Sequence, residues 1–188
     1  MKKIILVICF CFSTYANAES SGFLGDFVTS LQSKNGQIET AFSPDEGAEK
    51  LVLKVIDNSA QRLRVAAYSF TSAIIVRALI RAKQRGVDVQ VLVDKKANNG
   101  KANIAALNLL VNADIPTRTI SRFAIHHDKY MIADGINVQT GSFNYSAAAA
   151  KSNSENVIVI WNQTQVASSY EKHWHSRWND SAPYKSAY

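Results

Sequence analysis

The chain has 188 residues, with 21 Lys and Arg against 15 Asp and Glu and a formal net charge of +6. This length suits one domain with a real core. The charge suits a polyanionic partner, but it does not by itself indicate nucleic-acid binding, because many solvated surfaces carry as much. Both cysteines, Cys9 and Cys11, lie within residues 1–18. If those residues are removed, disulfides, cysteine nucleophiles and thiolate metal sites are excluded.

Residues 1–18 have the pattern of a secretory signal peptide. Two lysines precede an apolar run from Ile4 to Phe12, and Ala16-Asn17-Ala18 has the small-x-small form that signal peptidase cleaves. The run is too short to anchor the chain stably in a membrane, and no later segment is long and apolar enough to span one. We therefore expect a single mature domain, residues 19–188, that is exported without a stable membrane anchor, with the periplasm as its destination.

The first elements of the mature chain are expected to be a helix, a strand and a second helix. Residues 19–34 carry apolar side chains at helical spacing, and residues 37–42 are typical of a strand. Ser43-Pro44-Asp45-Glu46 combines an N-cap residue, a proline at the first helical position and an acid three residues after the serine. This combination predicts that a helix begins at Ser43.

A strand, a helix and another strand follow in that order. Residues 63–68 and 87–93 are apolar enough for buried strands, and the helix between them is expected over residues 73–85, ended by Gly86. This order predicts a right-handed βαβ unit in an α/β fold, with a mixed, largely parallel sheet flanked by helices on both faces. Working residues of such sheets lie beyond the carboxyl ends of the strands.

The loop over residues 94–101 lies at such an edge and contains three lysines. It could contact a phosphate backbone, or it could be an ordinary solvated loop. A helix over residues 102–111 and a short strand over residues 117–120 should lead from this loop to the segment that carries the chemistry.

That segment is a predicted β-hairpin from His127 to Asn144. Its first half alternates, so a strand would place His127 and Lys129 on one face. Asp134-Gly135 suits a tight turn, and residues 136–140 are typical of the returning strand. The return brings Gly141, Ser142 and Asn144 towards the histidine and the lysine. An imidazole, a fixed positive charge and neutral hydrogen-bond donors together suit a phosphate.

The remaining elements are two helices and a strand. A short helix over residues 145–150, with Asn144 near its cap, would direct free N–H groups at an anion. Glu155 precedes an apolar strand over residues 156–161. The last helix carries an apolar stripe, typical of a core face or a subunit interface, made of Val166, Tyr170, Trp174 and Trp178.

The spacing of the hairpin residues resembles the HKD signature of the phospholipase D superfamily, which is H-x-K, four residues, D, six residues, then G-S and N. His127, Lys129, Asp134, Gly141, Ser142 and Asn144 meet it. The flanking segments, among them TGSFNYS, NSENVIVIWN and HWHSRWN, are similar to the single-motif, Nuc-like branch of small secreted bacterial endonucleases. The resemblance covers nearly all of the chain after its first two dozen residues.

The resemblance implies the fold and roles for these residues. His127 would form a covalent phosphohistidine that water hydrolyses, while Lys129, Ser142 and Asn144 would bind the phosphate oxygens. Glu155 matches the acid that receives the second ring N–H of the histidine, with an ordinary salt bridge as the alternative. Asp134 and Gly141 are expected to be structural members of the motif, because Asp134 precedes a glycine in a turn.

One motif supplies one histidine, yet the leaving oxygen needs a proton. The resemblance implies a homodimer with a shared active site at the two-fold axis, in which the second copy of His127 donates that proton. The local alternatives are His126, His173 and His175. His126 would point to the opposite strand face, and the other two are two residues apart on a helix, a poor spacing for a metal chelate. We expect no metal and no cofactor.

The leading hypothesis is therefore a metal-independent phosphodiesterase that cleaves nucleic acid with low sequence specificity. DNA is the expected substrate, and RNA stays open as an alternative. A phospholipase D acting on lipid head groups would use the same chemistry, although no exposed apolar membrane-binding face is evident in the sequence. A third hypothesis is a protein that binds nucleic acid at the same phosphate site without cleaving it. The intact set of His127, Lys129 and Glu155 favours an enzyme over this binding protein.

Overall fold

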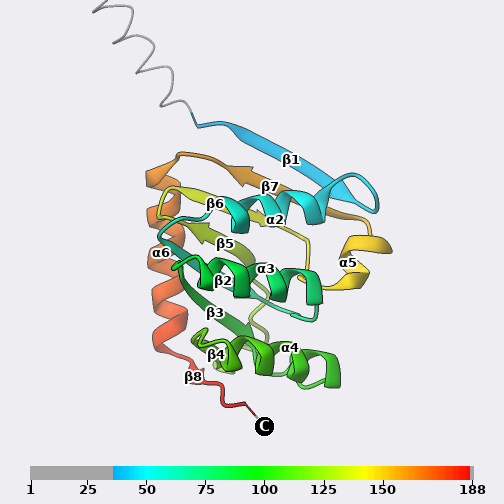
Figure 1. The fold of residues 1–188 in the computed structure, drawn as a ribbon, viewed down its shortest axis with the longest axis vertical. Helices are drawn as coiled ribbons and strands as arrows, with labels where there is room; N and C mark the ends of the chain where they lie inside the picture. Colours follow the sequence, from blue (N-terminus) through cyan, green and yellow to red (C-terminus); the bar gives the residue numbers. More distant parts are fainter. Residues whose placement is uncertain (1–35, 187–188) are drawn as a thin grey trace, which may run out of the picture. The chain divides into compact units, whose positions relative to one another are not determined.

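The computed structural model describes residues 36–186, so the expected signal peptide and the helix expected over residues 19–34 lie outside the described residues. Figure 1 shows one sheet with helices against it. The strands are β1 (Ile38–Ser43), β2 (Arg62–Ala67), β3 (Asp88–Asp94), β4 (Thr117–Ile120), β5 (Lys129–Ala133), β6 (Asn137–Gly141), β7 (Glu155–Ile160) and β8 (Ala182–Pro183). The helices are α2 (Ala48–Asn58), α3 (Ala73–Gln84), α4 (Lys101–Asn112), α5 (Ala147–Lys151) and α6 (Thr164–Asn179).

The sheet has eight strands in the order β1-β7-β6-β5-β2-β3-β4-β8. The expected mixed α/β fold is confirmed, but the expectation of a largely parallel sheet is wrong. Only the β2–β3 and β3–β4 pairs are parallel among the described strands, and the other five pairs are antiparallel. The hairpin strand β5 pairs antiparallel with β2, so β5, β6, β7 and β1 all extend the sheet by antiparallel pairing.

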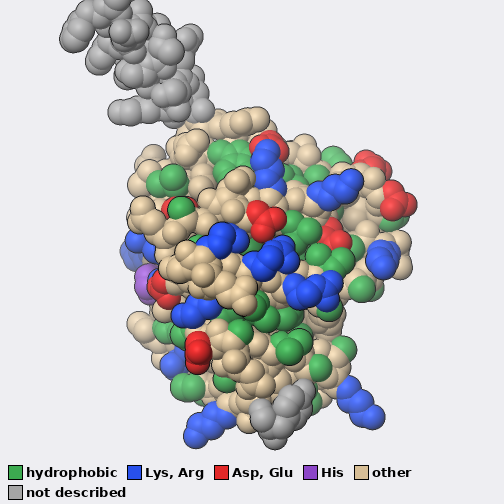
Figure 2. All heavy atoms as spheres, in the orientation of Figure 1, with side chains coloured by type: hydrophobic (Ala, Val, Ile, Leu, Met, Phe, Trp, Pro, Cys, Tyr) green, Lys and Arg blue, Asp and Glu red, His purple; other side chains and the backbone are tan. Residues whose placement is uncertain are grey.

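The two faces of the sheet are buried by different helices. Alternate side chains of β2 and β5, such as Val65 and Met131, belong to the larger apolar core with α2 and α3. Their neighbours Ala66 and Tyr130 belong to a smaller core with Trp174 of α6. This alternation is the expected period of two, and the expected apolar stripe of α6 forms the second core. Lys and Arg side chains gather on the solvent side of α2 and α3 (Figure 2).

One part of the α6 face is not covered by any of the described helices. β1 and β7 pair so that Ile38 lies beside Ile160 and Thr40 beside Ile158, and Phe42 continues the row. Ile38 is 61% exposed and Phe42 is 49% exposed, although the opposite side chains of these strands pack against α2. We call Ile38, Thr40, Phe42, Ile158 and Ile160 the open half-sheet. No described helix is long and apolar enough to cross a membrane.

The predicted helix start at Ser43 is wrong, because Ser43 stays in the sheet. It is the last residue of β1, pairs with Glu155 and is buried. A turn follows, closed by the Phe42 N–H donating to the Glu46 carbonyl at 3.2 Å, and α2 begins at Ala48 with Gly47 as its N-cap. Strand pairing therefore overrides the local capping pattern. The other predicted elements from residue 37 onward agree with the structure to within one or two residues at most ends.

Candidate active site

The motif hairpin consists of β5 and β6, joined at Asp134–Ile136. Asp134 has φ 56° and Gly135 has φ 70°, a conformation that a tight turn requires. β5 begins at Lys129 rather than at His127, so the prediction that both residues lie in the strand is wrong. His127 instead lies in the irregular segment that enters β5, and it is exposed to solvent. This segment is not paired with β2, because the pairing of β5 with β2 ends at Lys129.

The histidine and the lysine still lie together, and Tyr68 holds them. The Lys129 ammonium donates to the His127 carbonyl oxygen at 2.8 Å. The rings of Tyr68 and His127 meet edge to face at a centroid distance of 4.5 Å, and Nζ of Lys129 lies 5.2 Å from the Tyr68 ring centroid. Tyr68 directly follows β2, whose Ala67 pairs with Lys129. The tyrosine therefore contacts both motif residues from the neighbouring strand.

Lys129 is a buried cation at the first residue of β5, an inner strand of the sheet. Only 7% of the residue is exposed. Burial lowers the pKa of Lys129, while the carboxylates of Glu155 and Asp128 oppose that shift. A desolvated ammonium that is only partly neutralised by carboxylates attracts a phosphate more strongly than an exposed one would.

Ser142 and Glu155 form the second half of the site. The Ser142 hydroxyl donates to Oε2 of Glu155 at 2.6 Å, and its oxygen accepts the Asn156 backbone N–H at 3.0 Å. Oε1 of Glu155 accepts from the Asn153 amide at 3.0 Å. Both carboxylate oxygens are thus engaged by Ser142 and Asn153 within residues 36–186. The expected hydrogen bond between Glu155 and the His127 ring is not formed in this structure.

Asn144 belongs to a segment that the core fixes on both sides. Phe143 and Tyr145 are fully buried, and the Tyr145 hydroxyl donates to Gln139 at 2.7 Å. Oδ1 of Asn144 is buried and has no hydrogen-bond partner within residues 36–186. Asn144 lies near the cap of the next helix, as expected, but the cap itself is Ser146, whose side chain accepts from the Ala149 N–H at the start of α5. The Asn144 amide is therefore not used by the helix.

The contacts of Asp134 and Gly141 are with the backbone in or next to neighbouring strands, as expected for structural members of the motif. The Asp134 carboxylate accepts three successive backbone N–H groups, those of Ala60, Gln61 and Arg62, at 3.0, 2.7 and 3.0 Å. It therefore holds the entry to β2 at the end of β5 opposite Lys129. Gly141 has φ 148°, and a Cβ at this position would lie 2.2 Å from the Asn156 carbonyl oxygen. Only glycine lets β6 approach β7 this closely.

The other histidines have distinct places. His126 is buried, and its Nδ1 lies 3.3 Å from Oδ2 of Asp128. The same oxygen lies 3.0 Å from Nε2 of His173 on α6. His175 is exposed and lies against the edge of Trp174. Of the three candidate local acids, only His173 lines the cavity beside His127 within the described part of the chain.

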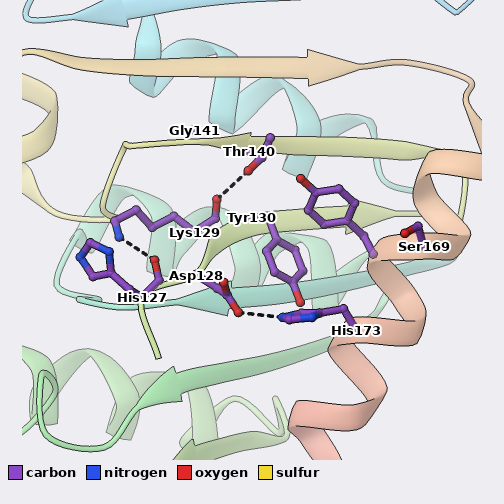
Figure 3. Close-up of a pocket in the computed structure, with 9 residues that line it drawn as sticks. His127, Asp128, Lys129, Tyr130, Thr140, Gly141, Ser169 and His173 are labelled. Atoms are coloured by element: carbon purple, nitrogen blue, oxygen red, sulfur yellow. Dashed lines mark hydrogen bonds and ion pairs between the residues drawn. The ribbon is translucent and has the colours of Figure 1, made fainter. Parts of the chain in front are cut away.

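The cavity opens between the motif and α6. Its volume is about 400 Å³, and Figure 3 shows His127 and Lys129 at one side and His173 at the other, with Tyr130 between them. Asp128, Thr140, Gly141, Ser169 and Tyr170 complete its walls. Neither Tyr68 nor this cavity was expected from the sequence. The position of Tyr68 at the carboxyl end of an expected buried strand was the available signal, because functional residues gather there.

The lysine loop after β3 is attached to the same edge. Lys95, Lys96 and Lys101 are exposed. The buried Asp94 carboxylate accepts the Ala97 N–H at 2.7 Å and the His126 N–H at 2.8 Å. The loop and the segment leading to His127 are therefore joined by one side chain. No group of three or more His, Cys, Asp or Glu suited to a metal ion occurs within residues 36–186.

Comparisons with known proteins find a matching family and similar sequences. The family described as "Cardiolipin synthase, PLD-like domain" matches residues 52–178. A phospholipase D of Rickettsia conorii is 38% identical over 141 residues, which cover 75% of this chain and 69% of the relative. A mitochondrial cardiolipin hydrolase of Xenopus laevis is 28% identical over 140 residues, or 74% of this chain and 64% of the relative.

A solved structure is also similar over nearly its whole length. It is Nuc from Salmonella typhimurium, described as a phospholipase D family member. Nuc is 46% identical to this chain, with a TM-score of 0.79, and the match covers 80% of this chain and 99% of Nuc.

Proposed function

We propose, starting from the fact that this chain belongs to the phospholipase D superfamily of hydrolases acting on phosphodiester bonds, that its substrate is nucleic acid. The enzyme would cleave DNA or RNA internally with low sequence specificity. The observation that carries the proposal is that the Lys129–His127 contact and the Ser142–Glu155 hydrogen bond lie at the same end of the strands β5, β6 and β7, where the Glu155 carboxylate opposes the lowering of the Lys129 pKa. An exposed imidazole beside a buried ammonium suits attack on a phosphodiester.

The proposed reaction has two displacements at phosphorus. In the first, a ring nitrogen of His127 forms a bond to phosphorus, and the bond from phosphorus to the leaving oxygen breaks. In the second, water attacks the phosphohistidine and gives a proton to the group that protonated the leaving oxygen, the phosphorus–nitrogen bond breaks, and a phosphomonoester is released. Lys129, Ser142 and Asn144 would bind the non-bridging oxygens, where negative charge grows in each transition state. Glu155, which opposes the lowering of the Lys129 pKa by burial, would support both the ammonium and the positively charged ring.

The leaving oxygen needs a proton in the first displacement. We propose that His127 of the partner subunit donates it, in a homodimer whose active site is shared at the two-fold interface. The open half-sheet supports this assembly, because it is an apolar surface beside the motif strands with Ile38 61% and Phe42 49% exposed. Apolar patches of this kind are typical of subunit interfaces. His173 is the local alternative, since it lines the same cavity as His127.

The choice of nucleic acid over lipid rests on the likeness to Nuc, at 46% identity over 99% of that chain. The Rickettsia relatives favour a second candidate, since they are named phospholipase D, and the Xenopus relative is named a cardiolipin hydrolase. Both candidates share the chemistry at His127. They differ only in what surrounds the phosphate.

One assay separates the candidates. The chain without residues 1–18 is incubated with plasmid DNA and, separately, with phosphatidylcholine and cardiolipin vesicles. We expect nicking of the plasmid and no release of head group or phosphatidic acid. His127→Ala should abolish nicking but retain much of the DNA affinity, because contacts to other phosphates persist. Lipid hydrolysis without nicking would establish the phospholipase, and DNA binding without cleavage by the unmutated chain would establish a binding protein.

The proposed site of action is the periplasm, after removal of residues 1–18. The support is the signal-peptide pattern of the sequence, with Ala16-Asn17-Ala18 before the expected cleavage point. Expression of the full chain, followed by fractionation and N-terminal sequencing, tests this. We expect a periplasmic protein that begins at Glu19.

A further inference from the structure

The cavity beside His127 contains more than the phosphate chemistry requires. Its volume of about 400 Å³ lies within the usual range for small-molecule sites. Two walls, Tyr130 and Tyr170, are aromatic, and their rings meet edge to face at a centroid distance of 4.9 Å. Ser169 and His173 add polar groups from α6. An aromatic and polar cavity next to a scissile phosphate suits the group attached to that phosphate.

The Tyr130 hydroxyl is the first specific sign of a ligand. Tyr130 is 3% exposed, it lines the cavity, and its hydroxyl has no hydrogen-bond partner within residues 36–186. Burial raises the pKa of Tyr130, so the group is a neutral donor at any physiological pH. A buried hydroxyl without a partner destabilises a folded protein. A phenylalanine would avoid that loss, so a polar group of a ligand is the natural partner.

His173 is the second sign. Its Nε2 lies 3.0 Å from Oδ2 of Asp128, the oxygen that is also 3.3 Å from Nδ1 of His126. This contact fixes the imidazole against the cavity, next to the Tyr130 ring at a centroid distance of 6.1 Å (Figure 3). The side chain is 39% exposed, so a ligand in the cavity can reach it. Two oriented polar groups and an aromatic wall thus lie on the same side of His127.

We propose that this cavity is a subsite for one nucleoside of the substrate, the one next to the scissile phosphate. The base of this nucleoside packs against Tyr170. The polar edge of the base or a hydroxyl of the sugar forms hydrogen bonds with the Tyr130 hydroxyl and the His173 imidazole. Base stacking on aromatic side chains is tolerant of sequence, in keeping with low specificity. This inference rests on the proposed nuclease function.

The subsite has a consequence for the form of the substrate. A base within a duplex is paired and stacked, so it cannot enter a cavity lined by side chains unless it is flipped out, which costs energy. An unpaired strand offers its bases freely. The enzyme should therefore cleave single-stranded nucleic acid faster than the same sequence in a duplex.

The experiment compares two substrates, a labelled single-stranded oligonucleotide and methyl p-nitrophenyl phosphate, a phosphodiester without a nucleoside. The measured quantity is the ratio of their kcat/KM values. We expect this ratio to fall about 10-fold or more in Tyr170→Ala and in Tyr130→Phe, and to recover in Tyr170→Phe, which keeps the aromatic face. His175 lies on the same helix as Tyr170, is exposed and does not line the cavity. His175→Ala is therefore the matched control and should keep the ratio of the unmutated enzyme.

Tyr130→Phe also separates a substrate role from a structural one. Removal of an unpartnered buried hydroxyl should leave the melting temperature equal or higher, while the ratio falls. An unchanged ratio in Tyr130→Phe and Tyr170→Ala would overturn the subsite, as would equal cleavage of single-stranded and duplex oligonucleotides by the unmutated enzyme. Hydrolysis of the methyl ester without cleavage of any oligonucleotide would instead show that the nuclease proposal is wrong, and the subsite would fall with it.

Discussion

The ammonium of Lys129 donates to the backbone carbonyl of His127 at 2.8 Å, so the lysine and the histidine of the motif are joined to each other. The lysine does not reach the histidine ring. It fixes the path of the chain that carries that ring, and Tyr68 covers both side chains. A displacement of either residue therefore moves the other, and the phosphate site responds as one unit.

The pH profile should report the ionisation of Lys129. Burial lowers the pKa of this ammonium from 10.5, with Glu155 and Asp128 opposing the shift. Activity that depends on the cation is present below the lowered pKa and is lost as the pH rises through it. The kcat/KM for a p-nitrophenyl phosphodiester should thus decline at a pH below 10.5. Lys129→Arg should be slower overall but should keep its charge, so its decline should lie at higher pH. Equal midpoints in both proteins would contradict this.

Asp134 should contribute to stability rather than to chemistry. Its carboxylate accepts the N–H groups of Ala60, Gln61 and Arg62, so Asp134→Ala leaves three donors without this partner. We expect a loss of about 1–3 kcal/mol in the free energy of unfolding, measured by urea denaturation. Asp134→Asn retains one acceptor oxygen and should lose less. The activity per folded molecule should remain within about threefold of the original, because the change affects the free energy of folding and not the reacting groups. A collapse of kcat in a fully folded Asp134→Asn would assign the residue to the reaction.

His126 should make the fold sensitive to acid. Burial lowers its pKa from 6.5, and Asp128 and Asp94 oppose that shift. Because the unfolded chain keeps the ordinary pKa, it binds more protons below pH 6.5 than the folded chain does, and stability falls as the pH falls. His126→Asn keeps a donor towards Asp128 but does not titrate. Between pH 7.5 and pH 5, its urea midpoint should fall less than that of the unmutated protein. The exposed His175→Asn should behave like the unmutated protein.

The open half-sheet should hold the dimer together. Ile38→Asp places a charge on a side chain that is 61% exposed in the isolated subunit, so folding should tolerate it while association should not. We expect a monomer by sedimentation and a loss of nuclease activity of 100-fold or more. Leu109→Asp is the control, since Leu109 is 53% exposed on α4, away from β1. A fully active Ile38→Asp monomer would refute the shared site and favour His173 as the local acid.

Activity should survive removal of divalent metal ions. The groups proposed to bind the phosphate are Lys129, Ser142 and Asn144, and they carry the charge that metal ions bear in many nucleases. Nicking of plasmid DNA with EDTA on the order of 10 mM, in excess over any divalent metal ion, should match nicking in the absence of EDTA. Abolition by EDTA with recovery on addition of Mg²⁺ would require a different reaction.

The sequence predicts the elements well because each has a local cause. The Asp134-Gly135 turn, the apolar strand over residues 87–93 and the stripe from Val166 to Trp178 all occur where their patterns place them. The pairing of those strands has no local cause. β5 pairs with β2 in the antiparallel direction because of packing between distant segments. The strand–helix–strand order, from which a largely parallel sheet was expected, contains no information about this pair. The same limit explains Ser43, whose capping pattern is overridden by its pairing with Glu155.

The site divides in the same way. The spacing within residues 127–144 identifies the motif, since the hairpin alone brings its two ends together. Tyr68 comes from another strand, and its contacts with His127 and Lys129 depend on the pairing of Ala67 with Lys129. The joint contact of Asp128 with His126 and His173 depends on α6 packing over β5, which places residues 45 positions apart within hydrogen-bond distance. Such contacts follow from the tertiary fold, and local sequence patterns do not predict them.

The pairing of β1 with β7 also determines when the enzyme can become active during its synthesis. Ser43, near the start of the described chain, has its strand partner only at Glu155, the residue that also holds Ser142. A nascent chain that has not yet reached β7 therefore lacks both the edge of its sheet and the carboxylate of its site. Contacts this distant in sequence form late in folding. An incomplete chain would therefore lack phosphodiesterase activity, which would arise only with the final quarter of the polypeptide.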